Sequence, residues 1–525
     1  MLPLFPAGDL QSSEDTQLAH DVIQLAQRSI AAGRADQAIY LLRRYTEVNG
    51  EDFAAWKLLG IACHEEQLEL DAAHAFAKAA ALDSQDAASA MGLAQSTYLS
   101  GLAAANLFRN LLRLQPGELR AQLGLARALA AESEPDAAEA ALLAGLVREP
   151  AWSEGHKALA RLRYTMGDRN RFAESYARAC AAQPGNLALR LDWFRAVAQI
   201  RDWDGAGEII QEGERIFGVV PSLQIARLFL ASESGDVARA VSLFAATELL
   251  SDPVRDMAWV RHGIRTGDMA SAETTAARNI DTPLAAVFWP YLSLIWRLRD
   301  DPRAEWLDGT PTPVSVMDLA LGDTALAALA ELLRKLHTAR SPFAEQSVRG
   351  GTQTDQSLFL RHEPVLQALK ARVQRAVGDY VARLPPPVQG HPLLGVSREE
   401  VSSGRVFFSG SWSVRLGPQG HNVSHTHPMG WISSALYISV PPPRSLGPAP
   451  AGWLQFGTPP ADLNVTLQPA LQLEPKGGHL VLFGSRTWHR TVPFLDGERL
   501  VVSFDVRLPR VPEHSATAGI GERIS

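Results

Sequence analysis

Residues Gly420–Trp431 read G-H-N-V-S-H-T-H-P-M-G-W, and this stretch decides how the C-terminal part of the chain is interpreted. His425 and His427 are two positions apart, so on an extended strand both side chains lie on one face. A third histidine, His489, stands in a later apolar run. Neutral imidazole is a suitable ligand for iron, zinc, copper or nickel. We therefore expect these residues to bind one metal ion.

The residues around this stretch follow the period of two that is typical of β-strands. Short β-branched or aromatic runs, separated by Gly or Pro, begin after His391. They are Arg405–Leu416, Ile432–Val440, Trp453–Phe456, Leu471–Leu473, His479–Phe483, Trp488–Phe494 and Leu500–Val506. Strands of this length and spacing predict a sandwich or barrel. Helical periodicity precedes them at Met317–His337 and Glu363–Leu384, and the polar segment Asp300–Pro313 is expected to be a connection.

Residues 1–280 contain an internal repeat. A pair of packing residues recurs as Leu25–Ala26, Leu59–Gly60, Met91–Gly92, Leu125–Ala126 and Leu159–Ala160. Prolines recur at an interval of 34 residues, as Pro116, Pro150 and Pro184. Small residues let one helix approach the next, large residues fill the gap between them, and proline ends each unit. The pattern resembles the tetratricopeptide repeat, which implies a solenoid of helix pairs that binds a protein or peptide partner.

The composition is that of a globular protein with two or more domains. The chain has 525 residues, of which 46% are hydrophobic and 20% charged, and its net charge is -7. The acidic balance argues against nucleic acid as a partner, and no apolar run reaches the ~20 residues that span a bilayer. The N-terminus lacks the features of a signal peptide. Cys63 and Cys180 lie far apart, which favours a reducing compartment, so we expect a cytoplasmic protein.

The segment Gly410–Val506 resembles the double-stranded β-helix of the 2-oxoglutarate/iron(II)-dependent oxygenases. It is most similar to a bacterial 2OG-Fe(II) oxygenase group that is often fused to tetratricopeptide repeats. The matching stretches are S-G-S-W-S-V-R-L (Ser409–Leu416), H-T-H-P-M-G-W-I-S-S-A-L-Y (His425–Tyr437), P-K-G-G-H-L-V-L-F (Pro475–Phe483), W-H-R-T-V-P-F (Trp488–Phe494) and E-R-L-V-V-S-F-D-V (Glu498–Val506). The string R-G-G-T-Q-T (Arg349–Thr354) also matches.

This resemblance implies an enzyme in which Fe(II) and the co-substrate 2-oxoglutarate activate dioxygen for hydroxylation. It makes His425 the first iron ligand, His489 the distal ligand and Arg499 the anchor for the far carboxylate of 2-oxoglutarate. The second ligand falls on His427, where the superfamily has Asp or Glu. Three neutral ligands leave the site more positive than two histidines and one carboxylate would, so zinc or nickel remains an alternative to iron. His427 could also stand beside the metal, which would leave the third position free.

The direction in which Arg499 points depends on a turn. The strands on either side of Asp496–Gly497 are expected to form a hairpin. A two-residue turn would place Arg499 on the face opposite His489. A three-residue loop, with Gly497 in a left-handed conformation, would pair Pro493 with Arg499 and turn the guanidinium towards His489.

Several polar residues are weaker candidates for the pocket. Those expected to line it together with Arg499 are Tyr437, Asn422 and Ser503, with Arg415 as a further possibility. Residues that we do not expect to act in the site are His421 and His479, together with the core residues Trp412, Trp431 and Trp488.

The sequence therefore predicts a multidomain protein, α then β, with an N-terminal α-solenoid of tetratricopeptide-like helix pairs and a C-terminal double-stranded β-helix (jelly roll) with flanking helices. The expected divisions are a flexible N-terminus (1–15), the solenoid (16–299), a connection with a helix (300–340), the β-helix domain (341–510) and a tail (511–525).

The predicted function is that of an Fe(II)- and 2-oxoglutarate-dependent dioxygenase. It would hydroxylate a substrate presented by, or docked through, the solenoid, with dioxygen as co-substrate and with neither nucleic acid nor membrane as partner. One alternative is a cupin-type metalloenzyme that uses three histidines without 2-oxoglutarate. The other is a non-enzymatic repeat scaffold with a degenerate β domain.

Overall fold

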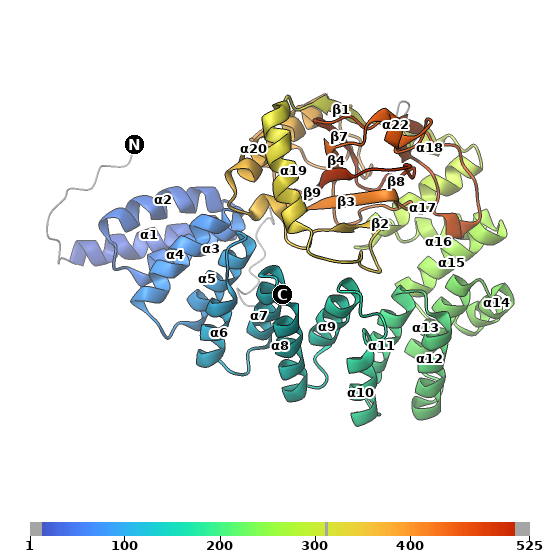
Figure 1. The fold of residues 1–525 in the computed structure, drawn as a ribbon, viewed down its shortest axis with the longest axis horizontal. Helices are drawn as coiled ribbons and strands as arrows, with labels where there is room; N and C mark the ends of the chain where they lie inside the picture. Colours follow the sequence, from blue (N-terminus) through green and yellow to red (C-terminus); the bar gives the residue numbers. More distant parts are fainter. Residues whose placement is uncertain (1–12, 310–312, 510–525) are drawn as a thin grey trace.

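The computed structural model describes residues 13–309 and 313–509. The N-terminal part is a curved row of helices in which each helix packs against the next (Figure 1). The helices are α1 (Ser13–Ala31), α2 (Ala35–Val48), α3 (Phe53–Glu65), α4 (Glu69–Leu82), α5 (Ala87–Leu99), α6 (Ala105–Leu114), α7 (Leu119–Ala131), α8 (Pro135–Arg148), α9 (Ser153–Thr165), α10 (Glu174–Ala182), α11 (Leu187–Gln199), α12 (Trp203–Phe217), α13 (Pro221–Ser234), α14 (Val237–Ala246), α15 (Pro253–Thr266), α16 (Met269–Ala277), α17 (Ala285–Leu298) and α18 (Arg303–Asp308). The predicted α-solenoid is confirmed.

Glycine at the repeated small position explains how closely the helices pack. Gly60 on α3 and Gly92 on α5 both lie against the ring of Phe76 on α4. A β-carbon on Gly60 would stand 2.8 Å from that ring, and one on Gly92 would stand 2.7 Å from it. Such distances are below van der Waals contact, so even alanine would push the helices apart. The large residue of one unit therefore fills a gap that small residues of two successive units leave open.

The C-terminal part consists of two antiparallel sheets. One has the strand order β1-β7-β4-β9-β3-β2, and the other has the order β6-β5-β8. The strands are β1 (Ser315–Asp318), β2 (Val348–Gln353), β3 (Phe408–Asn422), β4 (Ile432–Ser439), β5 (Leu454–Phe456), β6 (Leu471–Leu473), β7 (His479–Gly484), β8 (His489–Thr491) and β9 (Arg499–Val506). This arrangement confirms the predicted β fold after an α-helical region.

Helices flank this β region. They are α19 (Gly322–Leu336), α20 (Pro364–Arg383), α21 (Glu399–Ser402) and α22 (Pro443–Leu446), with short 3-10 turns at Leu358–Leu360 and Ala461–Leu463. Leucines of α19 and α20 pack with Leu500, Val502 and Phe504 of β9, which form one face of that strand. The alternate residues of β9 therefore face the space between the two sheets.

Several expected boundaries differ from the structure; for example, β3 extends to Asn422 and not only to Leu416, and the expected connection Asp300–Pro313 contains helix α18. The helix predicted from Met317 begins at Gly322, because Met317 lies in β1 and pairs with Leu480 of β7. The segment 300–340 therefore adds an edge strand to the large sheet. Ser13 already belongs to α1, whereas the rest of the expected flexible N-terminus up to residue 12 and the tail 511–525 lie outside the described residues.

The hairpin expected around Asp496–Gly497 is wrong. Strand β8 pairs with β5 in the small sheet, whereas β9 pairs with β3 and β4 in the large sheet, so Pro493 and Arg499 are not partners. Gly497 does have a positive φ, of 94°, as the turn required. The connection crosses between the sheets instead, and Leu495 N–H donates to Leu446 O of α22 at 3.0 Å.

The solenoid holds the β region through the turns inside its helix pairs, and Figure 1 shows the β region lying along that edge of the helical row. The contacting turns contain Gln67, Ser100, Thr165 and Arg201. The Gln67 amide donates to Phe408 O at 2.7 Å, and Ser100 O accepts from the His362 N–H at 2.9 Å. Four helix pairs of the solenoid therefore each contact a different segment of the C-terminal part.

Candidate metal centre

Three histidines from two separate segments converge on one point. Ligand atoms of His425, His427 and His489 all lie within 4.8 Å of one another. His425 and His489 are held by a pair of backbone hydrogen bonds, each 3.1 Å long. His427 N–H donates to Ser485 O at 2.8 Å, which fixes the second histidine against the loop before β8. The convergence expected from the sequence is therefore present, although β3 ends at Asn422 and the two histidines follow it in an extended segment.

Backbone carbonyls fix the orientation of two of the rings. His425 Nδ1 lies 2.8 Å from Val423 O, and His489 Nδ1 lies 3.0 Å from Thr487 O. A carbonyl oxygen can only accept, so each Nδ1 carries the proton and each Nε2 keeps its lone pair. That tautomer is the one in which Nε2 binds a metal ion.

A carboxylate orients the third ring. His427 Nδ1 lies 2.8 Å from Asp505 Oδ2 on β9, and Ser433 Oγ donates to Asp505 Oδ1 at 2.6 Å. A histidine that donates its second nitrogen to a carboxylate becomes a stronger metal ligand. Asp505 also places a negative charge next to the histidine that replaces the acidic ligand of the superfamily.

The surroundings keep the rings of His425 and His489 neutral. Burial, followed by the neighbouring His427, lowers the pKa of His425 to about 3. Burial also lowers the pKa of His489 well below its usual value, and His425 adds to the effect. The ring of Phe483 lies 4.7 Å from that of His489, and Trp412 stacks on His427 at 5.5 Å. Trp412 is thus a wall of the site and not core alone.

Arg499 lies at the other end of the space between the sheets. Its Nη2 donates to Thr491 Oγ1 at 3.0 Å, and its Nη1 donates to Gly452 O at 2.7 Å. Thr491 and His489 are two residues apart on β8, so they share a face ~7 Å apart. The guanidinium is therefore bonded to the face of β8 that carries His489, and it reaches this face by a crossover between sheets in place of the expected three-residue hairpin loop.

No carboxylate of the described residues neutralises this charge. Arg499 is 1% exposed, and its Nε–H has no partner there. Burial lowers its pKa, while the neighbouring Tyr437 acts in the opposite direction. Burial raises the pKa of Tyr437, so the phenol stays protonated beside the cation. A buried cation without a counter-ion is costly, and a bound anion would remove that cost.

The weaker candidates fall into different positions. Tyr437 is buried beside Arg499, and Ser503 lies on the same face of β9 as Arg499 and Asp505. The Asn422 amide donates to Ser347 Oγ at 2.9 Å, and that hydroxyl lies 3.2 Å from His425 Nε2.

Arg415 does not line the pocket. It pairs with Glu498 at 2.6 Å on the opposite face of β3, where its side chain is 43% exposed. His421 is half-buried with Nδ1 donating to Gln419 O, and His479 lies at the start of β7 with Nδ1 donating to Gly477 O, so neither joins the histidine cluster, as predicted.

Three contributors were not predicted. Asp505 carries a sequence signal, because a period of two from Arg499 places it on the inner face of an otherwise apolar strand. Thr491 shows the same period from His489. Ser347 has no such signal, because it reaches His425 from the loop before β2, far away in sequence.

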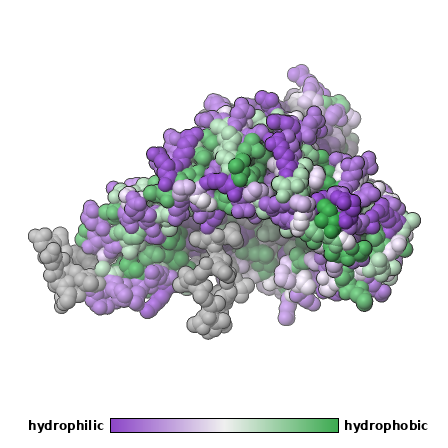
Figure 2. All heavy atoms as spheres, turned by 90° about the horizontal axis from the view of Figure 1, so that it is seen from below, coloured by the Kyte–Doolittle hydropathy of each residue, from purple (hydrophilic) through white to green (hydrophobic). Residues whose placement is uncertain are grey.

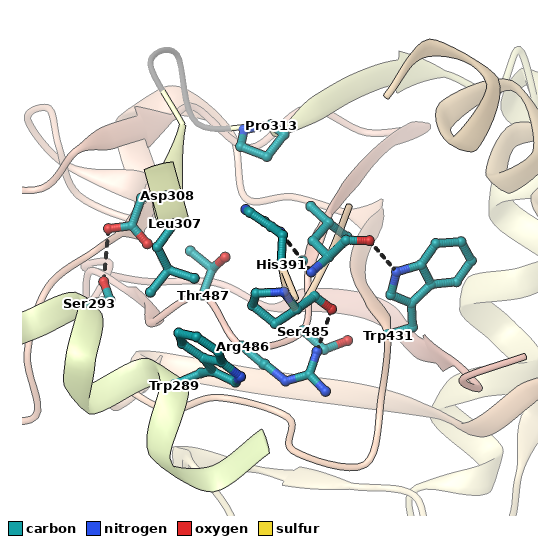
Figure 3. Close-up of a pocket in the computed structure, with 13 residues that line it drawn as sticks. Trp289, Ser293, Leu307, Asp308, Pro313, His391, Trp431, Ser485, Arg486 and Thr487 are labelled. Carbon is teal, nitrogen blue, oxygen red and sulfur yellow. Dashed lines mark hydrogen bonds between the residues drawn. The ribbon is translucent and has the colours of Figure 1, made fainter. Parts of the chain in front are cut away.

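The solenoid packs against the loop that precedes His489. A hollow of about 30 Å³, large enough for roughly one water, separates this loop from α17 and α18 (Figure 3). Its walls include Trp289 and Asp308 on one side and Thr487 on the other. Trp488 Nε1 donates to Pro290 O of α17 at 2.8 Å. The hollow is too small for a substrate, so we regard this face as a brace for His489.

A larger hollow adjoins the arginine end. It has a volume of about 400 Å³ and is lined in part by Tyr437 and Val481, with charged residues of other strands at its rim. Tyr437 therefore lies between Arg499 and this opening.

The donor set suits a divalent transition metal. Nitrogens bonded to one ion at ~2.1 Å lie ~3.0–3.4 Å apart in octahedral or tetrahedral geometry, so binding requires the ligand atoms, now within 4.8 Å of one another, to approach by up to about 2 Å. Three imidazoles, an oriented carboxylate behind one of them and an apolar wall fit iron, zinc or nickel.

A comparison with known protein families matches part of the β region. Residues 410–505 match the sequence model of the family described as "Putative 2OG-Fe(II) oxygenase". No match was found among the curated proteins. The chain thus carries an oxygenase-like domain joined to a tetratricopeptide-like solenoid, as predicted.

Solved structures similar to the chain include helical repeat proteins. The crystal structure of MamA protein is 17% identical with a TM-score of 0.29, covering 32% of this chain and 92% of that one. A thermophilic TPR protein in Thermus thermophilus is 24% identical with a TM-score of 0.24, covering 34% and 98%. A tetratricopeptide repeat protein from Parabacteroides merdae is 15% identical with a TM-score of 0.30, covering 46% and 97%.

Within the part of the chain that the structure describes, none of the helices combines the length and the apolar character needed to cross a membrane.

Proposed function

We propose that the protein is an Fe(II)- and 2-oxoglutarate-dependent dioxygenase that hydroxylates a protein or peptide docked through the solenoid. The observation that carries the proposal is Arg499, a buried guanidinium that faces the histidine cluster without a carboxylate partner among the described residues. A dicarboxylate spanning the two ends would supply both the missing counter-ion and a metal chelate. Dioxygen is the second co-substrate.

His425, His427 and His489 hold the metal ion through their Nε2 atoms. Bound Fe(II) supplies the redox chemistry with dioxygen and 2-oxoglutarate that the side chains of the protein lack. Asp505 keeps the His427 ring in the correct tautomer, and its charge offsets the extra positive charge of an all-histidine site. This arrangement supports His427 as a direct ligand.

At the other end, Arg499 grips the far carboxylate with its planar fork of N–H donors. Tyr437 adds a phenolic O–H, and Thr491 keeps the guanidinium in place. The apolar cluster between the sheets, which includes Phe483, excludes water from the space between the two ends. Ser503 and Asn422 line or orient this space from the strand and from the loop beside His425.

The domain divisions that accompany the proposal are those expected from the sequence, with the oxygenase domain at 341–510. We also propose a cytoplasmic location. Cys63 and Cys180 are both buried free thiols, which is consistent with a reducing compartment.

The decisive experiment is anaerobic addition of Fe(II) and then 2-oxoglutarate to the full chain. We expect a weak visible charge-transfer band, and we expect Arg499→Ala to abolish it while iron stays bound. Arg415→Ala is the matched control, because Arg415 lies on the neighbouring strand but points to the surface. Succinate release in air provides the second measurement.

A specific observation keeps a second candidate open. The ligand set consists of three histidines with no carboxylate in direct reach, which also suits a cupin-type metalloenzyme that does not use 2-oxoglutarate. Bound metal without the band, and with succinate absent, would favour that enzyme over the dioxygenase.

A further inference from the structure

Three arginines form a stripe across the first helices of three successive helix pairs of the solenoid. Arg127 on α7, Arg161 on α9 and Arg195 on α11 recur at an interval of 34 residues, and all three are exposed. Helices α7 and α9 contact each other, as do α9 and α11. The same position is thus basic in three successive units, in a chain whose net charge is -7.

The stripe lies near the metal centre. The guanidinium of Arg161 stacks on Phe343 at 3.5 Å and pairs with Asp355 at 2.6 Å. Four residues after Phe343 in the same loop, Ser347 touches His425. Arg127 lies near Arg161 and this loop, because the charges of Arg127, Arg161 and Asp355 all influence the pKa of Tyr98.

A second loop closes the other side of the site. Thr458 O accepts a hydrogen bond from Ser424, which precedes His425. Farther along this loop, Asp462 pairs with Arg201 at the end of α11, at 2.8 Å. The histidine segment is therefore flanked by two loops, one docked on α9 and the other on the turn after α11.

Several arginines on this side of the molecule are only weakly neutralised. Among the described residues no ion pair involves Arg127, and Arg195 has only Asp192 from its own helix, at 2.6 Å, with 61% of its side chain exposed. Arg349 on β2, near the segment that carries His425 and His427, hydrogen-bonds only to backbone carbonyls in the described structure. Exposed pairs of this kind contribute little and exchange readily for a better partner.

We propose that the stripe binds an extended, acidic polypeptide segment and guides it to the metal centre. Neighbouring helices lie ~8–10 Å apart, which matches three residues of an extended chain at ~3.3 Å each. Carboxylates at every third position would therefore meet successive arginines. The binding step stands on the stripe alone, whereas delivery to the metal rests on the function proposed above.

The pattern favours a peptide over a nucleic acid. Glu154 and Asp192 stand on the helices α9 and α11 beside the stripe. A phosphate backbone requires a denser run of positive charge than three arginines interrupted by carboxylates. The arginine fork, by contrast, matches single carboxylates. Figure 2 shows that the face seen from below is largely hydrophilic with separate apolar patches, so a broad apolar surface does not dominate there.

The test measures fluorescence anisotropy of labelled peptides of about twelve residues with the full chain. One peptide carries Asp at every third position, a second carries Asn there, and a third probe is a single-stranded oligonucleotide of equal charge. The double variant Arg127→Glu/Arg195→Glu removes the stripe but leaves Arg161, which packs against the loop. The matched control is Arg109→Glu/Arg215→Glu. Those arginines are exposed on α6 and α12 and bond only within their own helices.

We expect the Asp peptide to bind, the stripe variant to weaken it about tenfold, and the control to leave it unchanged. Added salt should weaken binding to the wild type more than to the stripe variant. Equal binding of the Asn peptide, tighter binding of the oligonucleotide, no binding of the Asp peptide, or equal loss in both variants would overturn the proposal.

The two proposals fail separately. The charge-transfer band with Fe(II) and 2-oxoglutarate involves neither Arg127 nor Arg195, so it should persist in the stripe variant. A band without peptide binding would reject the stripe and keep the dioxygenase. Stripe-dependent peptide binding without the band would keep the stripe and reject the dioxygenase.

Discussion

Two buried arginines, one in each region of the molecule, show how differently the regions treat charge. The side chain of Arg163 in the solenoid is 3% exposed and pairs with Glu139 at 2.7 Å and with Glu174 at 3.3 Å. Arg499 in the β region is 1% exposed, and its described partners are a carbonyl and a hydroxyl. In the solenoid, carboxylates of the protein neutralise the buried cation, whereas in the β region the described partners of the buried cation are all uncharged.

This contrast separates a structural cation from one that binds a ligand. Removing one partner of a satisfied buried pair destabilises a protein strongly. Removing a buried cation that lacks a counter-ion should cost the apo protein little, and should instead cost affinity for an anion. The following predictions can sharpen this distinction or break it, and they are arranged from the largest expected effect to the smallest.

The largest effect is expected where the β region depends most on an external group. His489→Ala should lower metal affinity and succinate formation by at least about a thousandfold, since one of three ligands is lost. In the wild type, added metal should raise the melting temperature, and in this variant it should not. Metal content after desalting and thermal shift are the measurements. His479→Ala should behave as the wild type, and metal retention by His489→Ala equal to that control would reject the site.

The arginine pair provides the direct test. Arg163→Met should lower the free energy of unfolding by about 3–5 kcal/mol because two carboxylates lose their buried partner. Arg499→Met should leave the stability of the apo protein unchanged or higher, and should weaken 2-oxoglutarate binding by about a hundredfold. Chemical denaturation and ligand titration give the two values. A large loss of apo stability in Arg499→Met would show that Arg499, like Arg163, is needed for the stability of the protein itself.

A smaller effect is expected at the carboxylate behind His427. Asp505→Asn retains the shape of the side chain but removes its charge, so metal affinity should fall by about 10–100-fold. A competition assay with a metal chelator measures the change. Asp496→Asn, in the exposed turn before β9, is the control and should have no effect. Unchanged affinity in Asp505→Asn would mean that His427 does not bind the metal directly.

The smallest effect concerns the link between the two regions. Trp488→Phe removes the hydrogen bond to Pro290 O and should cost about 1 kcal/mol, with a few-fold loss of metal affinity because the brace behind His489 loosens. Trp296→Phe removes a comparable bond to Glu273 inside the solenoid and should cost similar stability without changing metal affinity. Equal metal affinity in the two variants would show that the brace has no role at the site.

The two regions also differ in how far the sequence alone predicts them. The repeat was predictable because its contacts join neighbours in sequence, such as Gly60 with Phe76. The histidine cluster was predictable because two ligands share one strand-like segment. The hairpin was not, since Asp496–Gly497 forms the expected turn but each flanking strand pairs with a distant one. Ser347 was missed for the same reason.

The contacts made by Gln67, Ser100, Thr165 and Arg201 set a limit on how this molecule can vary. Most solenoids gain or lose units easily, because each unit touches only its neighbours. Here an inserted or deleted unit would put every later turn out of step with its own docking point. The copy number of the helix pair is therefore a fixed dimension of the protein, and duplications that a free solenoid tolerates should be rejected in this one.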